Sequence, residues 1–476
     1  MAKFKSYRKD QLHLLPPCLE DYVPEGHLAR LVYEVVEGLN TSAIEETYSE
    51  LGQNTYHPKI FLKLFFYGYA TGVRSGRKIS ARCETDTAYM YLAEMYRPDF
   101  RTINDFRKNH LSLIEGYFVE IVKMCKELGM VKVGELTIDG SKLKANAAPR
   151  RSKDKEGYEA WLKRVEEEVR EILREAGRVD AEEDALYGEQ RGDELPGGIQ
   201  GKMVIKKKIE EVLRGWGEEA KEKINLTDPD SRFMKERKGV IVPAYNCQVA
   251  VEGQVIVGAD VVKEANDRQQ LVPMIEQAET TLEEDVGEVL ADSGYASYDN
   301  YEYLSQKEKK GYIPDQYFEK LKQGDYGDPD NKYHKENFWY DSEKDVYICP
   351  EGKELGFYKE RDSEGGVVPR KQWIYKGSDC VDCCVCTQCT KAKYRTIARE
   401  KREPLQEEMR QRLLSEEGKE KYKRRLQIEP IFGHLKYNLG YRTFLLRTLE
   451  KVRGEFKLMC IGFNLRKIFQ YKMAMA

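Results

Sequence analysis

The sequence predicts an α/β protein in which helices cover both faces of a mixed β-sheet. Leu136 and Ile138 alternate with polar residues in "GELTIDG", which is typical of a strand. Two β-branched runs flank Glu252-Gly253, and this pattern indicates a β-hairpin. Helix and strand patterns then alternate up to about residue 314. Such an order favours a sheet packed between helices.

Residues 1–130 are expected to form a helical N-terminal domain. The stretch "HPKIFLKLFFYGYATG" carries apolar residues at helical spacing. A second helix is expected over 99–129, with a cap at Thr102 or Asn104 and a stop at Gly129. A DNA-binding helical module and a plain helical bundle both fit this region. The basic residues that favour the first are Arg74, Arg77, Lys78, Arg82, Arg101, Arg107 and Lys108.

Three further segments follow along the chain. Residues 131–314 are expected to form the first part of the core, and the highly charged stretch 150–225 within it predicts an exposed helical insert. Residues 315–395 hold six of the 11 cysteines and are rich in Tyr, Gly and Asp, so we expect a separate β-rich insertion. Residues 396–476 return to helical patterns and are expected to complete the core.

The composition limits the class of protein. Hydrophobic residues make up 41% and charged residues 34% of the 476 residues, which is typical of a globular protein. No apolar run reaches the roughly 18 residues that a membrane span needs. The basic N-terminus is not followed by an apolar stretch, so we expect no secretory signal, a cytoplasmic location, and cysteines that are free thiols or metal ligands.

Positive charge is concentrated near the C-terminus. Residues 391–476 hold 22 lysines and arginines against 10 acids, whereas the whole chain has a net charge of −3. A basic block on an otherwise acidic protein favours a polyanionic partner such as DNA. A solvated helix rich in Lys, Arg and Glu would produce the same count without any partner.

Two aspartates are predicted at the ends of strands. Asp139 and Asp292 each follow an apolar strand pattern, and each precedes a small residue. Ligands collect at strand ends in α/β sheets, and carboxylate oxygens suit Mg²⁺. The alternative is that each Asp simply begins a turn.

The stretch "YKRRLQIEPIFGHLKYNLGYR" contains one acid among basic and aromatic residues. On a continuous helix, Tyr422, Arg425, Glu429 and Lys436 would share an arc of about 60°. That face would offer one acid to a metal, two cations to phosphates and one ring for stacking. Pro430 is expected to kink or restart the helix.

His434 lies in the same segment. It would point about 120° away from Tyr422 on a continuous helix. We therefore expect His434 to have a structural or DNA-proximal role and no part in the acid site.

The spacing Tyr-x2-Arg-x3-Glu-x6-Lys resembles the signature of one branch of bacterial insertion-sequence DDE transposases. The blocks "TIDGSKLKANA" and "LADSGYAS" resemble the first and second acid blocks of that group. This resemblance covers nearly the whole chain. It implies a ribonuclease-H-like catalytic core, a helical DNA-binding domain before it, and an insertion between the second Asp and the Glu.

The resemblance also implies a site and a reaction. Asp139, Asp292 and Glu429 would bind two Mg²⁺ or Mn²⁺ ions. Water would attack the phosphodiester at the element end, and the freed 3′-hydroxyl would then attack the other strand or the target DNA. The remaining signature residues would act on DNA. Arg425 and Lys436 would hold phosphates, and Tyr422 would contact the DNA near the cut.

The implied partners are double-stranded DNA with terminal inverted repeats, target DNA, and a second copy of the chain on the DNA. The implied location is the bacterial cytoplasm, at the nucleoid. Two alternatives remain at this point. One is a DNA-binding protein of the same ancestry that does not transpose, and the other is a simple metal-dependent DNA nuclease.

The cysteines of residues 315–395 form a separate motif. "CPEGK" begins at Cys349, and "CVDCCVCTQC" places Cys380, Cys383, Cys386 and Cys389 every third residue. A structural zinc site, an iron–sulfur run and unmetallated thiols all fit this spacing. Related transposases share a pattern like Cys349, Cys380, Cys383 and Cys389, which would be the four zinc ligands.

Overall fold

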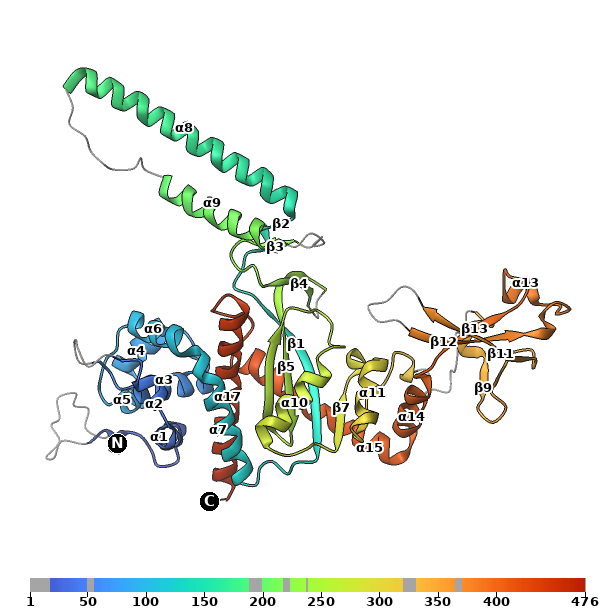
Figure 1. Cartoon of the computed structure of the whole chain (residues 1–476). Helices are drawn as coiled ribbons and strands as arrows, with labels where there is room; N and C mark the ends of the chain where they lie inside the picture. The colour runs from blue at the N-terminus through green and yellow to red at the C-terminus, as the bar shows by residue number, and fades with distance from the viewer. Residues whose placement is uncertain are drawn as a thin grey trace, which may run out of the picture.

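The computed structural model of the chain describes residues 18–48, 55–187, 199–216, 223–236, 239–319, 331–363 and 370–475. Figure 1 shows a central sheet with helices around it, from which two parts project. One is a helical hairpin made of α8 and α9, and the other is a small sheet made of β9 to β13.

The central sheet is mixed. Within the described residues its strand order is β4-β5-β1-β7-β8, and β6 also pairs with β5. β1 runs antiparallel to β5 and parallel to β7, and β8 runs parallel to β7. This mixed α/β arrangement is compatible with a ribonuclease-H-like DDE core. The strands are β1 (Glu135–Lys144), β4 (Arg232–Lys235), β5 (Ile241–Glu252), β6 (Val255–Val262), β7 (Glu288–Ala291) and β8 (Lys310–Tyr312).

The predicted hairpin is confirmed by β5 and β6. The two strands pair antiparallel up to Glu252 and Val255. Gly253 in the turn has a φ of 60°, a left-handed conformation that glycine adopts without steric cost. Nearly every residue of β6 is buried, so both faces of this strand are covered.

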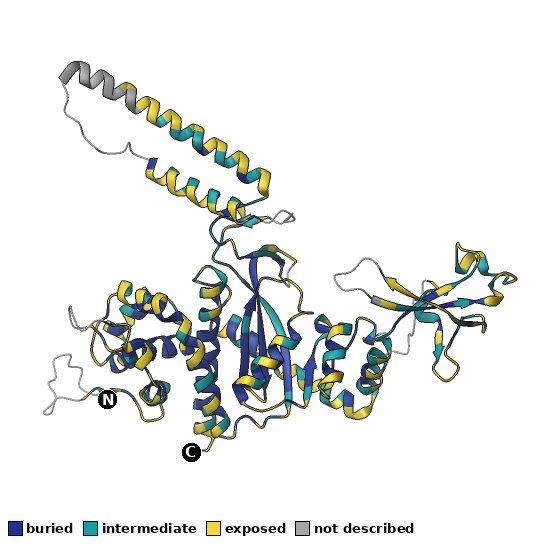
Figure 2. Ribbon diagram, in the orientation of Figure 1, coloured by how far each residue is buried: buried dark blue, intermediate teal, exposed yellow. Residues whose placement is uncertain are grey.

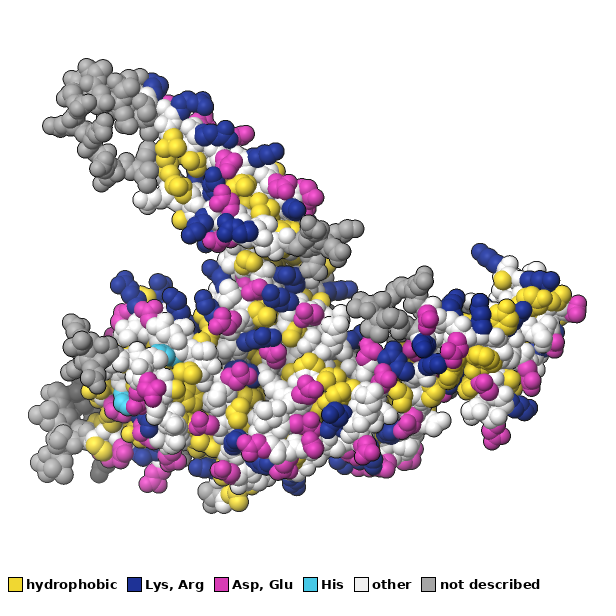
Figure 3. Space-filling view, in the orientation of Figure 1, with side chains coloured by type: hydrophobic (Ala, Val, Ile, Leu, Met, Phe, Trp, Pro, Cys, Tyr) yellow, Lys and Arg dark blue, Asp and Glu magenta, His cyan; other side chains and the backbone are white. Residues whose placement is uncertain are grey.

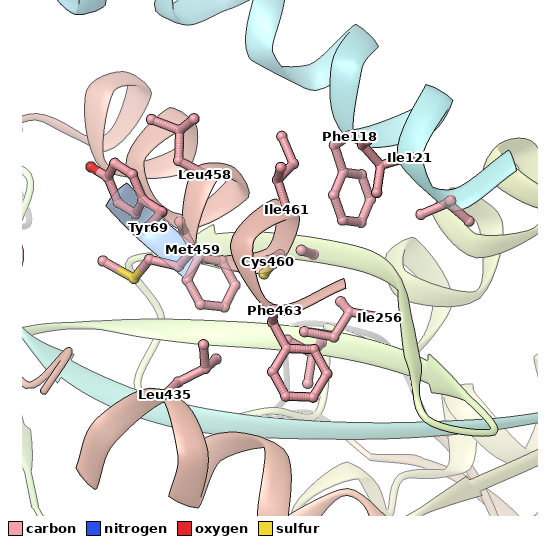
Figure 4. Close-up of a cluster of buried hydrophobic side chains, with 14 of the residues drawn as sticks. Tyr69, Phe118, Ile121, Ile256, Leu435, Leu458, Met459, Cys460, Ile461 and Phe463 are labelled. Atoms are coloured by element: carbon pink, nitrogen blue, oxygen red, sulfur yellow. The ribbon is translucent and has the colours of Figure 1, made fainter. Parts of the chain in front are cut away.

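Two helices fill the space between the sheet and the N-terminal region. α10 (Leu271–Leu282) packs on β5 and β6, and α17 (Leu449–Met475) packs on β6, α3 and α7. The middle of α17, from Glu455 to Leu465, is buried without interruption, whereas both of its ends are more exposed. Figure 4 shows its residues Leu458 to Phe463 meeting Tyr69, Phe118 and Ile256 from three other elements.

The N-terminal region is helical, as predicted. α3 (Pro58–Thr71) is capped by His57, whose ring accepts a hydrogen bond from the Lys59 N–H, and it ends at Gly72 with a φ of 84°. The helices of this region are α1 (Leu28–Gly38), α2 (Ser42–Glu45), α3, α4 (Gly76–Thr85), α5 (Thr87–Leu92), α6 (Phe100–His110) and α7 (Ile114–Glu127).

The single helix expected over 99–129 is wrong in two details. A 3₁₀ turn at Leu111–Leu113 divides it into α6 and α7. Its cap is neither Thr102 nor Asn104, because both lie inside α6. Asp99 is the cap, and its carboxylate accepts a hydrogen bond of 2.7 Å from the Arg101 N–H.

The N-terminal helices and the central sheet share one hydrophobic core, which we call the body core. It contains buried residues from α1, α3 and α7, from β1, β5, β6 and β7, and from α17. A buried carboxylate links the two sides. Glu455 on α17 is fully buried, binds Arg74 at 3.1 Å, and accepts hydrogen bonds from the N–H groups of Leu445 and Leu446.

The first projecting part is the hairpin of α8 (Lys155–Tyr187) and α9 (Ile199–Arg214). Two short strands, β2 (Ser152–Lys153) and β3 (Ile224–Asn225), pair antiparallel at its base. Its own small core includes Tyr158, Ile209 and Trp216. Figure 2 shows that most of the described surface of this hairpin is exposed or half-buried.

The second projecting part is an antiparallel sheet of order β13-β12-β11-β10-β9. Its core, which we call the insertion core, has five buried residues, namely Phe338, Tyr347, Leu355, Tyr375 and Ile397. The strands are β9 (Trp339–Asp341), β10 (Val346–Ile348), β11 (Glu354–Ser363), β12 (Arg370–Gly377) and β13 (Thr396–Glu400).

The remaining helices connect these parts. Among them, α11 and α15 contact β8, and α14 contacts both α11 and β8. No helix in the described ranges has the length and apolar character that crossing a membrane requires. The helices are α11 (Tyr298–Gln306), α13 (Cys386–Cys389), α14 (Glu403–Leu414), α15 (Glu416–Arg424) and α16 (Glu429–Gly433).

Candidate active site

Asp139 and Asp292 lie side by side on neighbouring strands. β1 and β7 are parallel, and their register pairs Ile138 with Ala291. The next residue of each strand is one of the two aspartates. Pairing residues of adjacent strands project on the same side of a sheet, so the two carboxylates meet at one edge.

One detail of the strand prediction is wrong. β1 does not end at Asp139-Gly140 but continues to Lys144. The reason is that β5 pairs with β1 as far as Lys144, whereas β7 stops at Ala291. Asp139 is therefore held within a strand, while Asp292 caps the turn that follows β7.

Burial affects the protonation of both acids. Burial raises the pKa of Asp139 to about 6, and the negative charge of Asp292 adds to that shift. Burial also raises the pKa of Asp292. One backbone N–H partly offsets each shift, because Gly140 donates to Asp139 and Gly294 donates to Asp292, each at 2.8 Å. A carboxylate pair held this way gains stability when a cation or a proton arrives.

A third carboxylate in the cluster, Asp267, was not expected from the sequence. Its charge raises the pKa of both Asp139 and Asp292. Asn246 and Gln248 each donate a hydrogen bond of 2.7 Å to its Oδ1 atom. Both of these amides are buried on β5, and Asp267 is therefore fixed in place beside the pair.

The glycines after the two acids leave room for Asp267. A Cβ atom on Gly140 would lie 2.7 Å from Oδ1 of Asp267, and one on Gly294 would lie 3.3 Å from Oδ2. The Asp267 carboxylate therefore sits between the residues that follow Asp139 and Asp292. A larger residue at Gly140 would displace it, because the first distance is too short for a Cβ contact.

The sequence contained one signal for Asp267. Asn246 and Gln248 stand two residues apart in the otherwise apolar strand "VPAYNCQVAV". Two buried amides on one face of a strand require hydrogen-bonding partners. The partner was hidden because the pattern of residues 267–284 predicts a helix that includes Asp267, whereas α10 begins only at Leu271.

Arg425 faces the two acids. Its positive charge lowers the pKa of Asp139 and of Asp292 and so opposes the effect of burial. Its Cζ atom lies 5.4 Å from the ring centre of Tyr422. The Nε atom of Arg425 is buried and has no hydrogen-bond partner among the described residues. Such a donor is suited to an oxygen that arrives with a ligand.

The other two signature residues lie at different depths. Lys436 donates to Ser141 Oγ at 2.6 Å and to the Lys142 carbonyl at 2.8 Å, both on β1 just after Asp139. Tyr422 is half-buried, and its ring makes an edge-on contact with Phe318 at 6.1 Å between ring centres.

The continuous helix on which the shared arc depends is absent. α15 ends at Arg424, a 3₁₀ turn covers Arg425–Gln427, and α16 restarts at Glu429. Pro430 is in the first turn of α16, where its missing N–H costs nothing. A π-helical turn, His434–Asn438, follows directly. The angles of a regular helix therefore do not apply between Tyr422 and Lys436.

Glu429 is not gathered with the other acids. Its side chain is exposed at the start of α16. Across the described ranges, no three His, Cys, Asp or Glu side chains are already arranged around a metal position. The chemistry of the donors nevertheless fits a hard divalent cation, since Asp139 and Asp292 offer paired carboxylate oxygens whose repulsion a cation would relieve.

A large cleft begins next to the acids. Its volume is about 880 Å³, and it extends from Arg268 and Ser293, which follow Asp267 and Asp292, to Trp339 on β9. Trp339 is 60% exposed. The cleft therefore connects the acid cluster to the cysteine-bearing sheet.

His434 and the cysteines lie away from the acids. The His434 ring packs on Phe463 at 5.8 Å, and burial with nearby Arg466 and Lys467 lowers its pKa. Cysteine side chains from two segments line one small cavity in the projecting sheet, and they are Cys349, Cys380, Cys383, Cys386 and Cys389.

Two family models match the chain. A transposase domain (DUF772) matches residues 17–109, and a transposase DDE domain matches residues 348–469. These matches support an insertion-sequence DDE transposase. Asp139, Asp267 and Asp292 precede the second match, which includes the cysteines and the signature segment. Comparison with curated proteins and with solved structures gives no match.

Proposed function

We propose that this transposase cleaves the ends of an insertion sequence and joins the 3′-hydroxyl to target DNA by metal-dependent phosphoryl transfer. The observation that supports this most is the half-buried pair Asp139 and Asp292 on adjacent parallel strands, where the negative charge of Asp292 raises the pKa of Asp139. Mg²⁺ or Mn²⁺ held there would activate the attacking oxygen and stabilise the leaving oxygen. The negative charge of Asp267 would add to the negative potential at the pair and so favour cation binding.

Glu429 is proposed as the last carboxylate of the site. It lies four residues after Arg425, which already faces Asp139 and Asp292. Its exposed side chain begins the short helix α16, directly after the 3₁₀ turn. A segment built from such short pieces can shift as a unit when DNA and cations arrive.

The signature cations are proposed to hold the DNA backbone. The buried Nε of Arg425 supplies a donor for a phosphate oxygen close to the acids. Lys436 places its ammonium group on β1 just beyond Asp139, where the next phosphate along the strand would lie. Tyr422 is proposed to contact the DNA near the cut.

The cleft beside the acids is proposed to receive part of the DNA. Arg402 and Arg410 in the cleft are paired with Asp299 and Asp315, so they mainly hold its walls together. Arg268 makes no ion pair within the described residues and is available for a phosphate. Exposed Trp339 at the far end offers a ring for base stacking.

The remaining parts of the proposal concern partners and location. The N-terminal helices are proposed to bind the inverted repeats, and the chain is proposed to act as a homodimer on DNA in the cytoplasm. In the view of Figure 3, lysines and arginines are interspersed with acids over the body. That face therefore offers scattered phosphate contacts and no uniform basic surface.

Replacement of Asp292 by alanine tests the reaction. Strand cleavage of labelled element ends in Mg²⁺ should fall by more than about 100-fold, because even residues that only orient metal ligands contribute about 10- to 100-fold. Binding to the same ends should survive. The matched control is Asp285→Ala, since Asp285 is an exposed aspartate in the loop before β7.

The same assay separates the alternatives. A wild-type protein that binds ends but never cleaves them would be a DNA-binding protein only. A protein that cleaves but never joins a 3′-hydroxyl to target DNA would be a nuclease. Either result would contradict the proposed transposition reaction.

A further inference from the structure

The cysteine cavity lies at one end of the insertion sheet. Cys349 follows β10, and the other four cysteines lie in the segment between β12 and β13. The cavity has a volume of about 30 Å³, roughly enough for one water molecule or one ion. Cys384 is exposed and does not line it.

We propose that this cavity binds one structural Zn²⁺ ion through four cysteine thiolates. Three ligands are Cys349, Cys380 and Cys389, and the fourth is Cys383 or Cys386. Paired C-x2-C spacing with a distant additional cysteine is a common zinc arrangement, in which the metal closes two loops on each other. The thiols line the cavity but have not converged, so the ion would draw four of them together.

The backbone around Cys349 is shaped for a metal-bound sulfur. The Lys353 N–H points at the Cys349 Sγ atom at 3.3 Å. A tight turn produces this geometry: the Gly352 N–H donates to the Cys349 carbonyl, and Gly352 has a φ of 76°. Hydrogen bonds of this kind orient a metal ligand and stabilise its negative charge.

The backbone on the opposite side approaches the sulfur of Cys380. A Cβ atom on Gly377 would lie 2.5 Å from Cys380 Sγ, so only glycine leaves the thiol in its place. Lys353 and Arg395 also line the cavity. Their positive charges offset part of the net negative charge of a zinc ion with four thiolates.

The insertion core explains why a metal is needed. It has five fully buried residues, against which Cys349 and Cys389 pack as partly buried neighbours. A core of this size rarely stabilises a domain alone, and small domains add disulfides or metals. A zinc ion would tie the β10–β11 turn to the segment between β12 and β13, which the chain connects only through two long strands.

The test is the zinc content of the purified full-length protein, measured by elemental analysis without DNA. One zinc per chain is expected in the wild type. Cys349→Ser and Cys389→Ser should each lose it, whereas Cys384→Ser should keep it. Single changes at Cys383 and Cys386 then identify the fourth ligand, because only one of them should lose the metal.

A second measurement does not depend on how the variants fold. Titration of folded wild-type protein with a mercurial thiol reagent should release one zinc ion, detected with a chromogenic chelator. Reaction of all five thiols that line the cavity without any released zinc would overturn the proposal. Bound iron with visible absorbance would also overturn it in favour of a cluster. Neither outcome bears on transposition, since the zinc site does not rest on the proposed function.

Discussion

The body and the insertion sheet of this chain are stabilised in different ways. The body core runs without interruption from the N-terminal helices through α17 to the central sheet. The insertion core is separate and has five fully buried residues. This difference determines which part of the chain can hold charged groups that repel one another. Only the body buries enough apolar surface to hold repelling carboxylates such as Asp139 and Asp292 in fixed positions.

The largest expected effect comes from breaking the body at Glu455. Glu455→Ala removes a fully buried carboxylate that pairs with Arg74 and accepts hydrogen bonds from the N–H groups of Leu445 and Leu446, so the free energy of unfolding should fall by about 3–5 kcal/mol. Chemical denaturation monitored by circular dichroism measures it. The control is Glu450→Ala, at an exposed site on the same helix.

The same variant tests whether the body and the insertion sheet are stabilised independently. If the two parts are stabilised independently, Glu455→Ala should keep its zinc under native conditions, while removal of zinc should leave the body transition unchanged. A zinc loss that accompanies the fall in body stability would show that the two cores are coupled.

A smaller effect is expected from the acid pair. The pKa of Asp139 is about 6 in the folded body against an ordinary value of 3.8. The folded state therefore holds a proton that the unfolded state releases, and stability should fall as the pH rises from about 4 to about 6. Asp139→Asn should remove this loss and stabilise the cation-free protein at pH 7 by about 2 to 3 kcal/mol.

Denaturation at a series of pH values measures this. Asp285→Asn, at the exposed loop position, should show no such change. Added Mg²⁺ should stabilise the wild type more than the variant. A variant that is less stable than the wild type at pH 7 would contradict the repulsion between the two acids.

The smallest effect is expected at Asp267. Asp267→Asn removes a negative charge but keeps a carbonyl oxygen that can accept from Asn246 or Gln248. The pKa of Asp139 and of Asp292 should both decrease, because Asp267 raises them. Carbon NMR titration of the carboxyl groups measures the shift. Unchanged values would place Asp267 outside the electrostatic field of the pair.

The sequence predicted the elements whose signals are local. The alternation around Leu136 and Ile138 and the turn at Glu252-Gly253 depend on neighbours a few residues away, and β1 and the hairpin of β5 and β6 follow them. A joint site of Asp139 and Asp292 was implied by the family resemblance alone, and the two residues come together because β1 and β7 are parallel neighbours.

The features that depend on distant contacts could not be read in the same way. Asp267 joins the site through amides on another strand, so its own local pattern indicated only a helix start. The shared arc from Tyr422 to Lys436 requires one continuous helix, and the interruption that Pro430 predicts is present. The short pieces of this segment follow the surface of the body, and tertiary contacts fix their angles.

The position of α17 has a consequence for synthesis. α17 is the last described element to leave the ribosome, yet it packs between α3, α7 and β6 in the middle of the body. The apolar faces of the earlier elements therefore stay exposed until α17 has been synthesised. A chain interrupted before residue 449 would therefore lack the helix that completes this core.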